Sequence, residues 1–238
     1  MGRAFEKRKH KMMANNAKTS KAFTRIGKEI AIAVKLGGPN PETNPKLRMV
    51  VQNAKSYNMP KDRVEAAIAR AANKDEKELE EVVFEGYGPH GIAIVVETAT
   101  DNNTRTVANI RMHFNRGNGA LGKTGSLDFL FERKGIFKIE RGSFSLEDLE
   151  LELIDYGAEE VADEEDGVYV TTSFTDFGKM QKGLEEKGIK ILSAELDRIP
   201  TNTTELTADQ QKEVHALIER LEDDDDVQNV FHNMKEDE

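Results

Sequence analysis

The segment Gly117–Thr124 has the residue types and spacing that could bind a nucleotide. It reads GNGALGKT and satisfies the pattern G-x-x-x-x-G-K-[ST] of a phosphate-binding loop. Such a loop leaves a buried strand and opens a helix, so that the N-terminus of the helix meets the phosphates. Here the sequence predicts a helix before the loop and a strand after it. We therefore interpret the segment as a flexible helix-to-strand loop; the alternative is that Lys123 and the loop amides contact nucleic-acid phosphate.

The other residues that could carry chemistry form no catalytic or metal-binding pattern. The five histidines are scattered without the spacing of metal ligands, and the chain has no cysteine. The run EDDDD at 222–226 lacks the alternation and the glycine of a calcium loop, so we interpret it as solvated charge. No serine stands in a nucleophile elbow. We therefore expect a protein that is not an enzyme, with no catalytic residue, no cofactor and no metal site.

Charge is divided unevenly along the chain. The net charge of the 238 residues is −10, but residues 1–75 hold 17 Lys and Arg against 6 Asp and Glu, a net of +11, which leaves −21 for the other 163. A basic module on an acidic body favours nucleic acid as the partner, whereas the alternative is an acidic body that only keeps the protein soluble. The first 20 residues are expected to form a mobile or partly helical arm. Its predicted contact residues are Arg3, Lys7, Arg8, Lys9, Lys11 and Lys18.

A predicted amphipathic helix at residues 21–36 separates basic from apolar side chains. At about 100° per residue, the apolar positions fall on one face: Phe23, Ile26, Ile30, Ala33 and Val34. The opposite face carries Lys21, Arg25, Lys28 and Lys35. Glu29 lies off this basic face, so no acid on the helix pairs with the bases. The face therefore favours an anionic partner, with an ordinary solvated face as the alternative.

The elements that must position these residues fall into three parts. Two further short amphipathic helices follow the first, one opened by Asn44-Pro45 and one, carrying Arg63 and Arg70, after Asn58-Met59-Pro60. Residues 73–81 look like a linker, and 85–91 like a turn before the first strand, Ile92–Thr98. A strand is predicted at Leu127–Phe131. Residues 136–196 then follow the order βαββαβ of a ferredoxin-like unit.

The predicted fold class is thus α+β and multi-domain. It combines an N-terminal three-helix bundle with two ferredoxin-like α/β domains, one inserted in the other. The expected boundaries are residues 1–80 for the basic helical domain with its arm, 81–134 with 198–238 for the split domain, and 135–197 for the inserted domain. No run of apolar residues approaches the roughly 18 needed to span a bilayer. With no cysteine, a reducing cytoplasm is the expected location.

Several short blocks of this sequence resemble the YebC/PmpR family. They occur in order along nearly the whole chain: AFTRIGKEI at 22–30, GGPNP at 37–41, NPKL at 44–47, NMPKD at 58–62, FEGYGP at 84–89, TDN at 100–102, RTV at 105–107 and GALGKTGS at 119–126. The last block overlaps the nucleotide-loop string at residues 119–124, so the resemblance explains the string without a nucleotide. The start departs from the family pattern GHSKWANIKHRK, because Phe5 stands near the place of the tryptophan.

The resemblance implies a helical N-terminal domain and two α/β domains, the third inserted in the second. Members are described as DNA-binding transcriptional regulators, and others as ribosome-associated factors that help translation through proline-rich stretches. It leaves two candidate functions: a DNA-binding regulator, and a translation factor that binds ribosomal RNA and has the ribosome as its partner. An NTPase is the third candidate, disfavoured by the context of Gly117–Thr124. We expect a monomer with no membrane partner.

Overall fold

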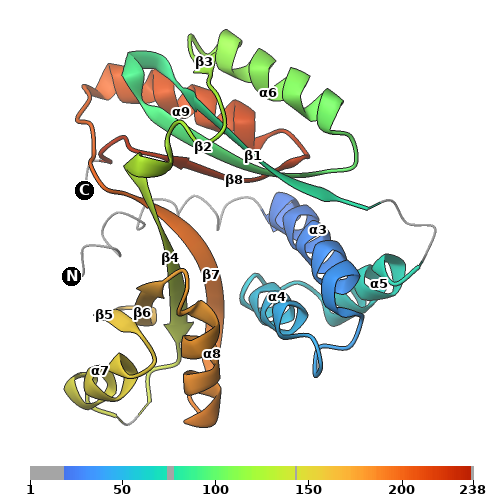
Figure 1. The fold of residues 1–238 in the computed structure, drawn as a ribbon, viewed down its shortest axis with the longest axis vertical. Coiled ribbons are helices and arrows are strands. Elements are labelled where there is room, and N and C mark those ends of the chain that lie inside the picture. Colours follow the sequence, from blue (N-terminus) through green and yellow to red (C-terminus); the bar gives the residue numbers. More distant parts are fainter. Residues whose placement is uncertain (1–18, 74–77, 143, 237–238) are drawn as a thin grey trace.

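The computed structural model describes residues 19–73, 78–142 and 144–236, and Figure 1 shows their arrangement. The basic arm predicted at residues 1–20 lies almost wholly outside this part of the chain. A helical bundle and two antiparallel sheets make up the described molecule. The long strands β4 and β7 run from one sheet region to the other (Figure 1). The predicted fold class is confirmed.

The bundle consists of three helices connected by short turns. They are α3 (Thr19–Gly37), α4 (Pro45–Ser56) and α5 (Lys61–Ala71). Asn44 caps α4, because its side-chain oxygen accepts a hydrogen bond from the Leu47 amide at 3.0 Å. The Asn44 amide group also donates to the carbonyl oxygens of Ala33 at 2.7 Å and Gly38 at 2.8 Å. This buried side chain therefore fixes the turn between α3 and α4 as well as the start of α4.

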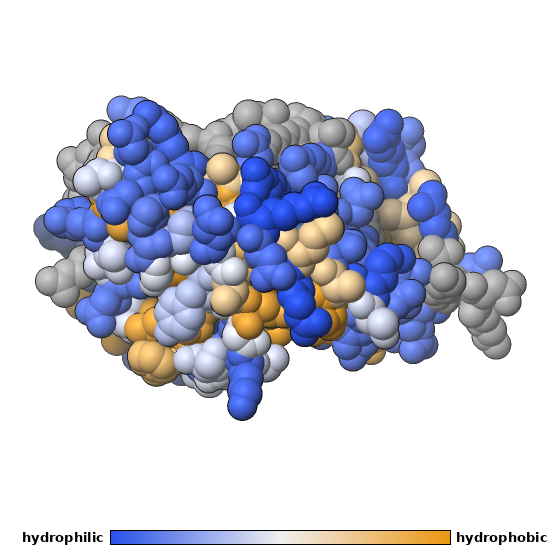
Figure 2. All heavy atoms as spheres, turned by 90° about the horizontal axis from the view of Figure 1, so that it is seen from above, coloured by the Kyte–Doolittle hydropathy of each residue, from blue (hydrophilic) through white to orange (hydrophobic). Residues whose placement is uncertain are grey.

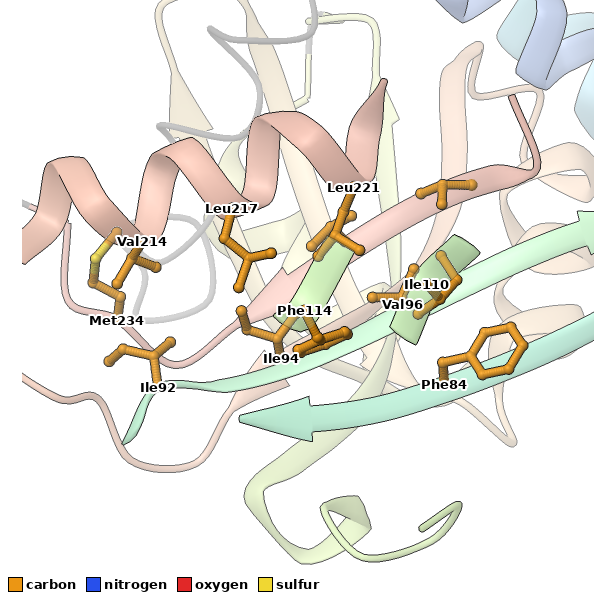
Figure 3. Close-up of a cluster of buried hydrophobic side chains, with 12 residues drawn as sticks. Phe84, Ile92, Ile94, Val96, Ile110, Phe114, Val214, Leu217, Leu221 and Met234 are labelled. Carbon is orange, nitrogen blue, oxygen red and sulfur yellow. The ribbon is translucent and has the colours of Figure 1, made fainter. Parts of the chain in front are cut away.

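The first sheet has the strand order β3-β1-β2-β8. Its strands are β1 (Glu80–Tyr87), β2 (Ala93–Thr100), β3 (Ala120–Leu121) and β8 (Val227–His232), with η1 (Pro89–Gly91) between β1 and β2. Two helices, α6 (Asn103–Arg116) and α9 (Ala208–Glu222), cover one face. Figure 3 shows Phe114 of α6 and Leu217 of α9 beside Ile94 of β2, and Ile110 of α6 beside Val96. A smaller cluster lies on the opposite face and includes Leu127, Phe131 and Phe231.

The second sheet has the order β5-β6-β4-β7. Its strands are β4 (Phe131–Ile139), β5 (Ala158–Glu164), β6 (Gly167–Ser173) and β7 (Ile191–Pro200). With α7 (Leu146–Ile154) after β4 and α8 (Phe177–Glu186) after β6, the chain order is the predicted βαββαβ. This sheet lies between β3 and α9 in the sequence, so one α/β unit interrupts the other.

Three predicted elements near the junctions differ in the structure. Residues 80–87 form strand β1, where a linker and a turn were predicted, because Val83–Gly86 pair with Ile94–Glu97 of β2. Leu127–Phe131 is not a strand: residues 128–130 form the 3₁₀ turn η2 (Asp128–Leu130), with Leu127 and Phe131 both packed on the first sheet. Strand β7 continues without a break to Pro200, past residue 196, where the ferredoxin-like order was predicted to end.

The described surface is mostly polar. Figure 2, which views the molecule from above Figure 1, shows a face dominated by hydrophilic side chains, with apolar side chains gathered in a few patches. None of the helices in the described part of the chain has the length and apolar character needed to cross a membrane.

Candidate nucleic-acid interface

The predicted contact residues fall into four groups in the structure. Arg3, Lys7, Arg8, Lys9, Lys11 and Lys18 lie outside the described residues. Lys21, Arg25 and Lys28 contact the segment 222–226, here called the acidic turn. Arg63 and Arg70 are exposed on α5, and the ammonium group of Lys35 on α3 donates to the carbonyl oxygen of Asn73 at 3.3 Å. Lys123 is exposed in residues 117–127, here called the glycine-rich loop. This loop contains β3, the edge strand of the first sheet.

The basic face of α3 packs against the acidic turn that follows α9. Lys21 forms an ion pair with Asp223, and Arg25 donates to the carbonyl oxygen of Glu222 at 3.4 Å. Lys28 donates to three acceptors: the carbonyl oxygens of Ala99 at 2.8 Å and Asp225 at 2.7 Å, and Asp226 Oδ1 at 2.9 Å. These are as many partners as an ammonium group has donors. The acidic turn was predicted to be solvated charge, and that prediction is wrong for Asp226, which is buried.

Asp226 joins the bundle to the first sheet and to α6. Its Oδ2 accepts from Arg105 at 2.7 Å and from Thr106 at 2.8 Å, while Oδ1 accepts from Lys28. Burial alone would raise the pKa of Asp226, but the hydrogen bonds from Arg105, Lys28 and Thr106 outweigh it and lower the pKa to about 2. Asp226 is therefore a carboxylate at neutral pH, and its charge is balanced from two elements.

The other side of the bundle is attached to the inserted unit. The Asn53 side chain of α4 donates to the carbonyl oxygen of Ala194 at 2.7 Å and accepts from the Ala194 amide at 2.9 Å. Asn53 thus satisfies both backbone groups of a residue on the outer edge of β7, as a neighbouring strand would. Arg48 adds an ion pair with Glu185 at 3.2 Å. The bundle is consequently held by both sheets.

A cleft of about 390 Å³ lies where the bundle meets the two sheets, and Glu29 of α3 lines it. Burial, and next the neighbouring Glu195 carboxylate on β7, raise the pKa of Glu29 to about 7. Glu81 acts in the same direction, whereas Lys46 and Arg25 lower the pKa. The cleft therefore contains a carboxyl group that titrates near neutral pH.

A second groove, of about 800 Å³, runs between α3 and α5. Small residues line it, among them Gly27 and Ala31 of α3 and Ala67 of α5. Arg63 and Arg70 stand along it, and the Arg63 guanidinium lies 5.8 Å from the centre of the Phe23 ring. Small residues allow a backbone to approach closely, and arginines can pair with phosphate oxygens. Neither arginine has an acidic partner among the described residues.

The glycine-rich loop is held by Glu85 of β1, a residue that the sequence did not single out. The buried Glu85 carboxylate accepts from the amides of Gly125 at 2.8 Å and Leu127 at 2.6 Å, and the Glu85 carbonyl oxygen accepts from the Gly122 amide at 2.7 Å. In a phosphate-binding loop such amides would face the anion. Here a carboxylate of the chain itself is the anion that they bind. The loop follows helix α6, contains the two-residue strand β3, and is followed by η2 and strand β4, so a helix precedes it as predicted.

Two family models match this chain, and together they cover most of it. A family model described as the TACO1/YebC protein N-terminal domain matches residues 3–74, and one described as the TACO1/YebC second and third domain matches residues 79–234. The chain belongs to the TACO1/YebC family. The resemblance inferred from the short sequence blocks is thereby confirmed.

Full-length relatives of this TACO1/YebC protein carry a regulatory name. A probable transcriptional regulatory protein of Cytophaga hutchinsonii is 60% identical over 238 residues and is covered completely, as is this chain. One of Flavobacterium johnsoniae is 56% identical over 236 residues, which cover 99% of this chain and 100% of the relative. The crystal structure of a conserved hypothetical protein from Aquifex aeolicus is similar with a TM-score of 0.77 and 36% identity, over 92% of this chain and 91% of that one.

Proposed function

We propose that this TACO1/YebC protein is a non-enzymatic regulator that binds DNA through its basic helical N-terminus. The observation that carries the proposal is the groove between α3 and α5, where Arg63 and Arg70 are exposed without an acidic partner among the described residues. The net charge of +11 on residues 1–75 supports an anionic partner. The relatives named probable transcriptional regulatory protein support DNA as that partner.

The proposed interface differs from the one expected from the helical wheel. Lys21, Arg25 and Lys28 contact the acidic turn, so we assign them to the contact between the bundle and the first sheet. The proposal keeps Arg63, Arg70 and Lys35 on the bundle, with the cations of the arm. Lys123 belongs to a separate surface, considered below.

The absence of catalysis is part of the proposal. Its support is the position of Glu85, whose carboxylate already takes the hydrogen bonds of Gly125 and Leu127. A nucleotide phosphate at these amides would meet a second negative charge, which is unfavourable at short range. We propose that the protein acts in the cytoplasm as a monomer, without a cofactor.

The test reverses two charges in the groove. Arg63→Glu with Arg70→Glu should weaken binding of duplex DNA at least ten-fold and reduce the dependence of affinity on salt, because fewer counterions are released. Both side chains are exposed, so the melting temperature should stay close to that of the wild type. The matched control is Lys179→Glu with Lys182→Glu on α8, which changes the net charge equally at exposed positions of the inserted unit.

The two variants distinguish a local interface from a general charge effect. Equal losses in the groove and control variants would mean that only net charge matters. Unchanged binding by the groove variant would refute the interface. Repeating the titration with purified ribosomes separates the DNA-binding regulator from the alternative, a translation factor that binds ribosomal RNA and assists synthesis of proline-rich sequences. Tighter, groove-dependent binding to ribosomes than to duplex DNA would favour the alternative.

A further inference from the structure

Phe129 is exposed on the face of the first sheet that α6 and α9 leave open. It lies in η2 between Leu127, which is fully buried, and Phe131, which is 6% exposed, and both of these pack on the sheet. The Phe129 side chain is 73% exposed. The turn therefore buries its two flanking apolar residues and presents an aromatic ring to solvent.

The loop that carries this ring is held in a defined shape. Glu85 binds its amides at Gly125 and Leu127, and the Gly122 amide donates to the Glu85 carbonyl oxygen. Gly125 has a φ of +81°, a conformation that disfavours other residues. A ring presented by a fixed loop loses little conformational entropy when a ligand binds.

Two further side chains give this surface its chemistry. Lys123 is exposed four residues after Gly119, and Tyr87 at the end of β1 is 45% exposed. The Tyr87 carbonyl oxygen lies so close to Gly119 that a Cβ there would be 2.6 Å away, which places Tyr87 against the start of the loop. Asp128, the acid next to Phe129, has the Arg198 guanidinium at 4.0 Å, which offsets its charge. An exposed cation and exposed aromatic rings, carried by one loop and the adjoining strand end, have the chemistry to contact the phosphate and bases of a single strand.

We propose that Lys123, Phe129 and Tyr87 form a second nucleic-acid site, which binds unpaired bases of a single strand by stacking. Phe129 and Tyr87 provide the π-faces, and Lys123 provides the phosphate contact. Bases within a duplex are already stacked on each other, so this surface discriminates in favour of single strands. The proposal rests on the proposed function only in taking nucleic acid as the partner, because it uses a different surface from the α3–α5 groove.

The test measures binding of the full chain to fluorescein-labelled oligouridylate, oligothymidylate and a DNA duplex. Phe129→Ala should weaken binding of the single strands roughly ten-fold or more, as loss of one stacked base predicts. Phe129→Tyr should retain binding, since it keeps the aromatic face. Lys123→Ala should weaken binding and flatten its salt dependence. The duplex affinity should be unchanged by all three.

The matched control is Leu151→Ala, which removes an apolar side chain that is 68% exposed on α7 of the inserted unit. Oligouridylate and oligothymidylate distinguish RNA from DNA as the source of the single strand. Equal weakening by Phe129→Ala and Leu151→Ala would overturn the proposal, as would unaltered single-strand binding by Phe129→Ala or no measurable binding by the wild type. Loss of single-strand binding in Phe129→Ala supports this site even if Arg63→Glu with Arg70→Glu leaves duplex binding intact, so the two proposals fail separately.

Discussion

The ammonium nitrogen of Lys28 lies 2.9 Å from Oδ1 of Asp226, although the two residues are 198 positions apart in the sequence. Lys28 stands on the first described helix, and Asp226 directly precedes the last strand. The pair is largely shielded, with side-chain exposures of 18% and 8%. It joins the basic bundle to the acidic body at a point where both charges have lost most of their water.

Removing one member of this pair should destabilise the protein. Asp226→Ala leaves Lys28 and Arg105 beside a cavity without their carboxylate, and breaking a buried pair in this way costs about 3–5 kcal/mol. The melting temperature of the full chain should fall accordingly. The control Asp209→Ala removes a side chain that is 92% exposed, whose pair with Lys212 contributes about 1 kcal/mol at most. Similar melting temperatures for the two variants would show that the pair contributes little.

The pair should also shape the response to acid. The pKa of Asp226 is lowered to about 2 from the ordinary 3.8, so its folded form prefers the carboxylate. The stabilisation is therefore complete above the ordinary pKa and is lost as the pH falls toward about 2. Asp226→Asn should remove this part of the acid sensitivity. Acid titrations of unfolding that run in parallel for the wild type and Asp226→Asn would contradict it.

Glu29 should contribute a pH dependence of the opposite sign. Its pKa is raised from 4.5 to about 7, so the folded protein holds a proton that the unfolded chain releases. Stability should consequently fall as the pH rises from about 4.5 to about 7. Glu29→Gln keeps the shape without the charge and should be relatively more stable at about pH 8 than at about pH 5. A stability difference between wild type and variant that does not change over this interval would exclude the assignment.

Glu85 should hold the glycine-rich loop without supporting nucleotide chemistry. Glu85→Ala leaves the amides of Gly125 and Leu127 without their acceptor, at a cost of about 1–3 kcal/mol for each that stays buried. Neither the wild type nor Lys123→Ala should hydrolyse ATP or GTP, because the loop joins a helix to a strand and not a strand to a helix. Stoichiometric ATP binding that Lys123→Ala abolishes would overturn this expectation, and a Glu85→Ala melting curve like that of the wild type would remove the anchoring role.

Local sequence patterns were sufficient to predict the elements whose apolar residues repeat with the period of a helix or a strand. The capped start of α4 at Asn44-Pro45 and the βαββαβ order of the inserted unit could both be read in this way. Strand β1 could not be predicted in this way. Its second half includes Glu85 and Gly86, which in the sequence alone resemble a polar turn, and the sequence does not show that the buried Glu85 carboxylate binds the amides of the glycine-rich loop. The run from Leu127 to Phe131 is apolar like a strand, but its ends fold back onto the sheet around Phe129.

The candidate site was less accessible to sequence reasoning because it depends on distant contacts. A helical wheel shows that no acid on α3 lies on the same face as Lys28. It cannot show that Asp226, which follows α9 in the sequence, contacts Lys28 in the folded protein. The signal that pointed to it was charge complementarity, with four consecutive aspartates in one part of the chain and an unpaired basic face in another. One-dimensional patterns cannot pair such segments, because the pairing depends on how the sheet between them is assembled. The exposed arginines of α5 were predicted from a basic helical face as well, and no acid of the described structure pairs with them.

The two basic faces of the bundle can therefore be told apart by a crossed experiment. Arg25→Glu with Lys28→Glu places one new carboxylate against the carbonyl oxygen of Glu222 and another against the buried Asp226 carboxylate, so it should destabilise the full chain by about 3 kcal/mol or more. The helical wheel alone would predict weaker nucleic-acid binding without unfolding for this variant, because it places both residues opposite the apolar face. Arg63→Glu with Arg70→Glu changes the net charge equally but touches no acid in the described structure.

The expected outcome is a separation of the two effects in melting curves and salt-titrated binding of the same proteins. The α3 variant should melt earlier, because Lys28 holds the bundle to the first sheet, and raising the salt concentration should not restore it, since buried charges are poorly screened. The α5 variant should melt normally and bind DNA weakly. If the α3 variant melted normally and lost DNA binding, its basic face would contact nucleic acid directly. The contact with the acidic turn would then have to open before binding, and the assignment of Lys28 to the interior of the protein would be wrong.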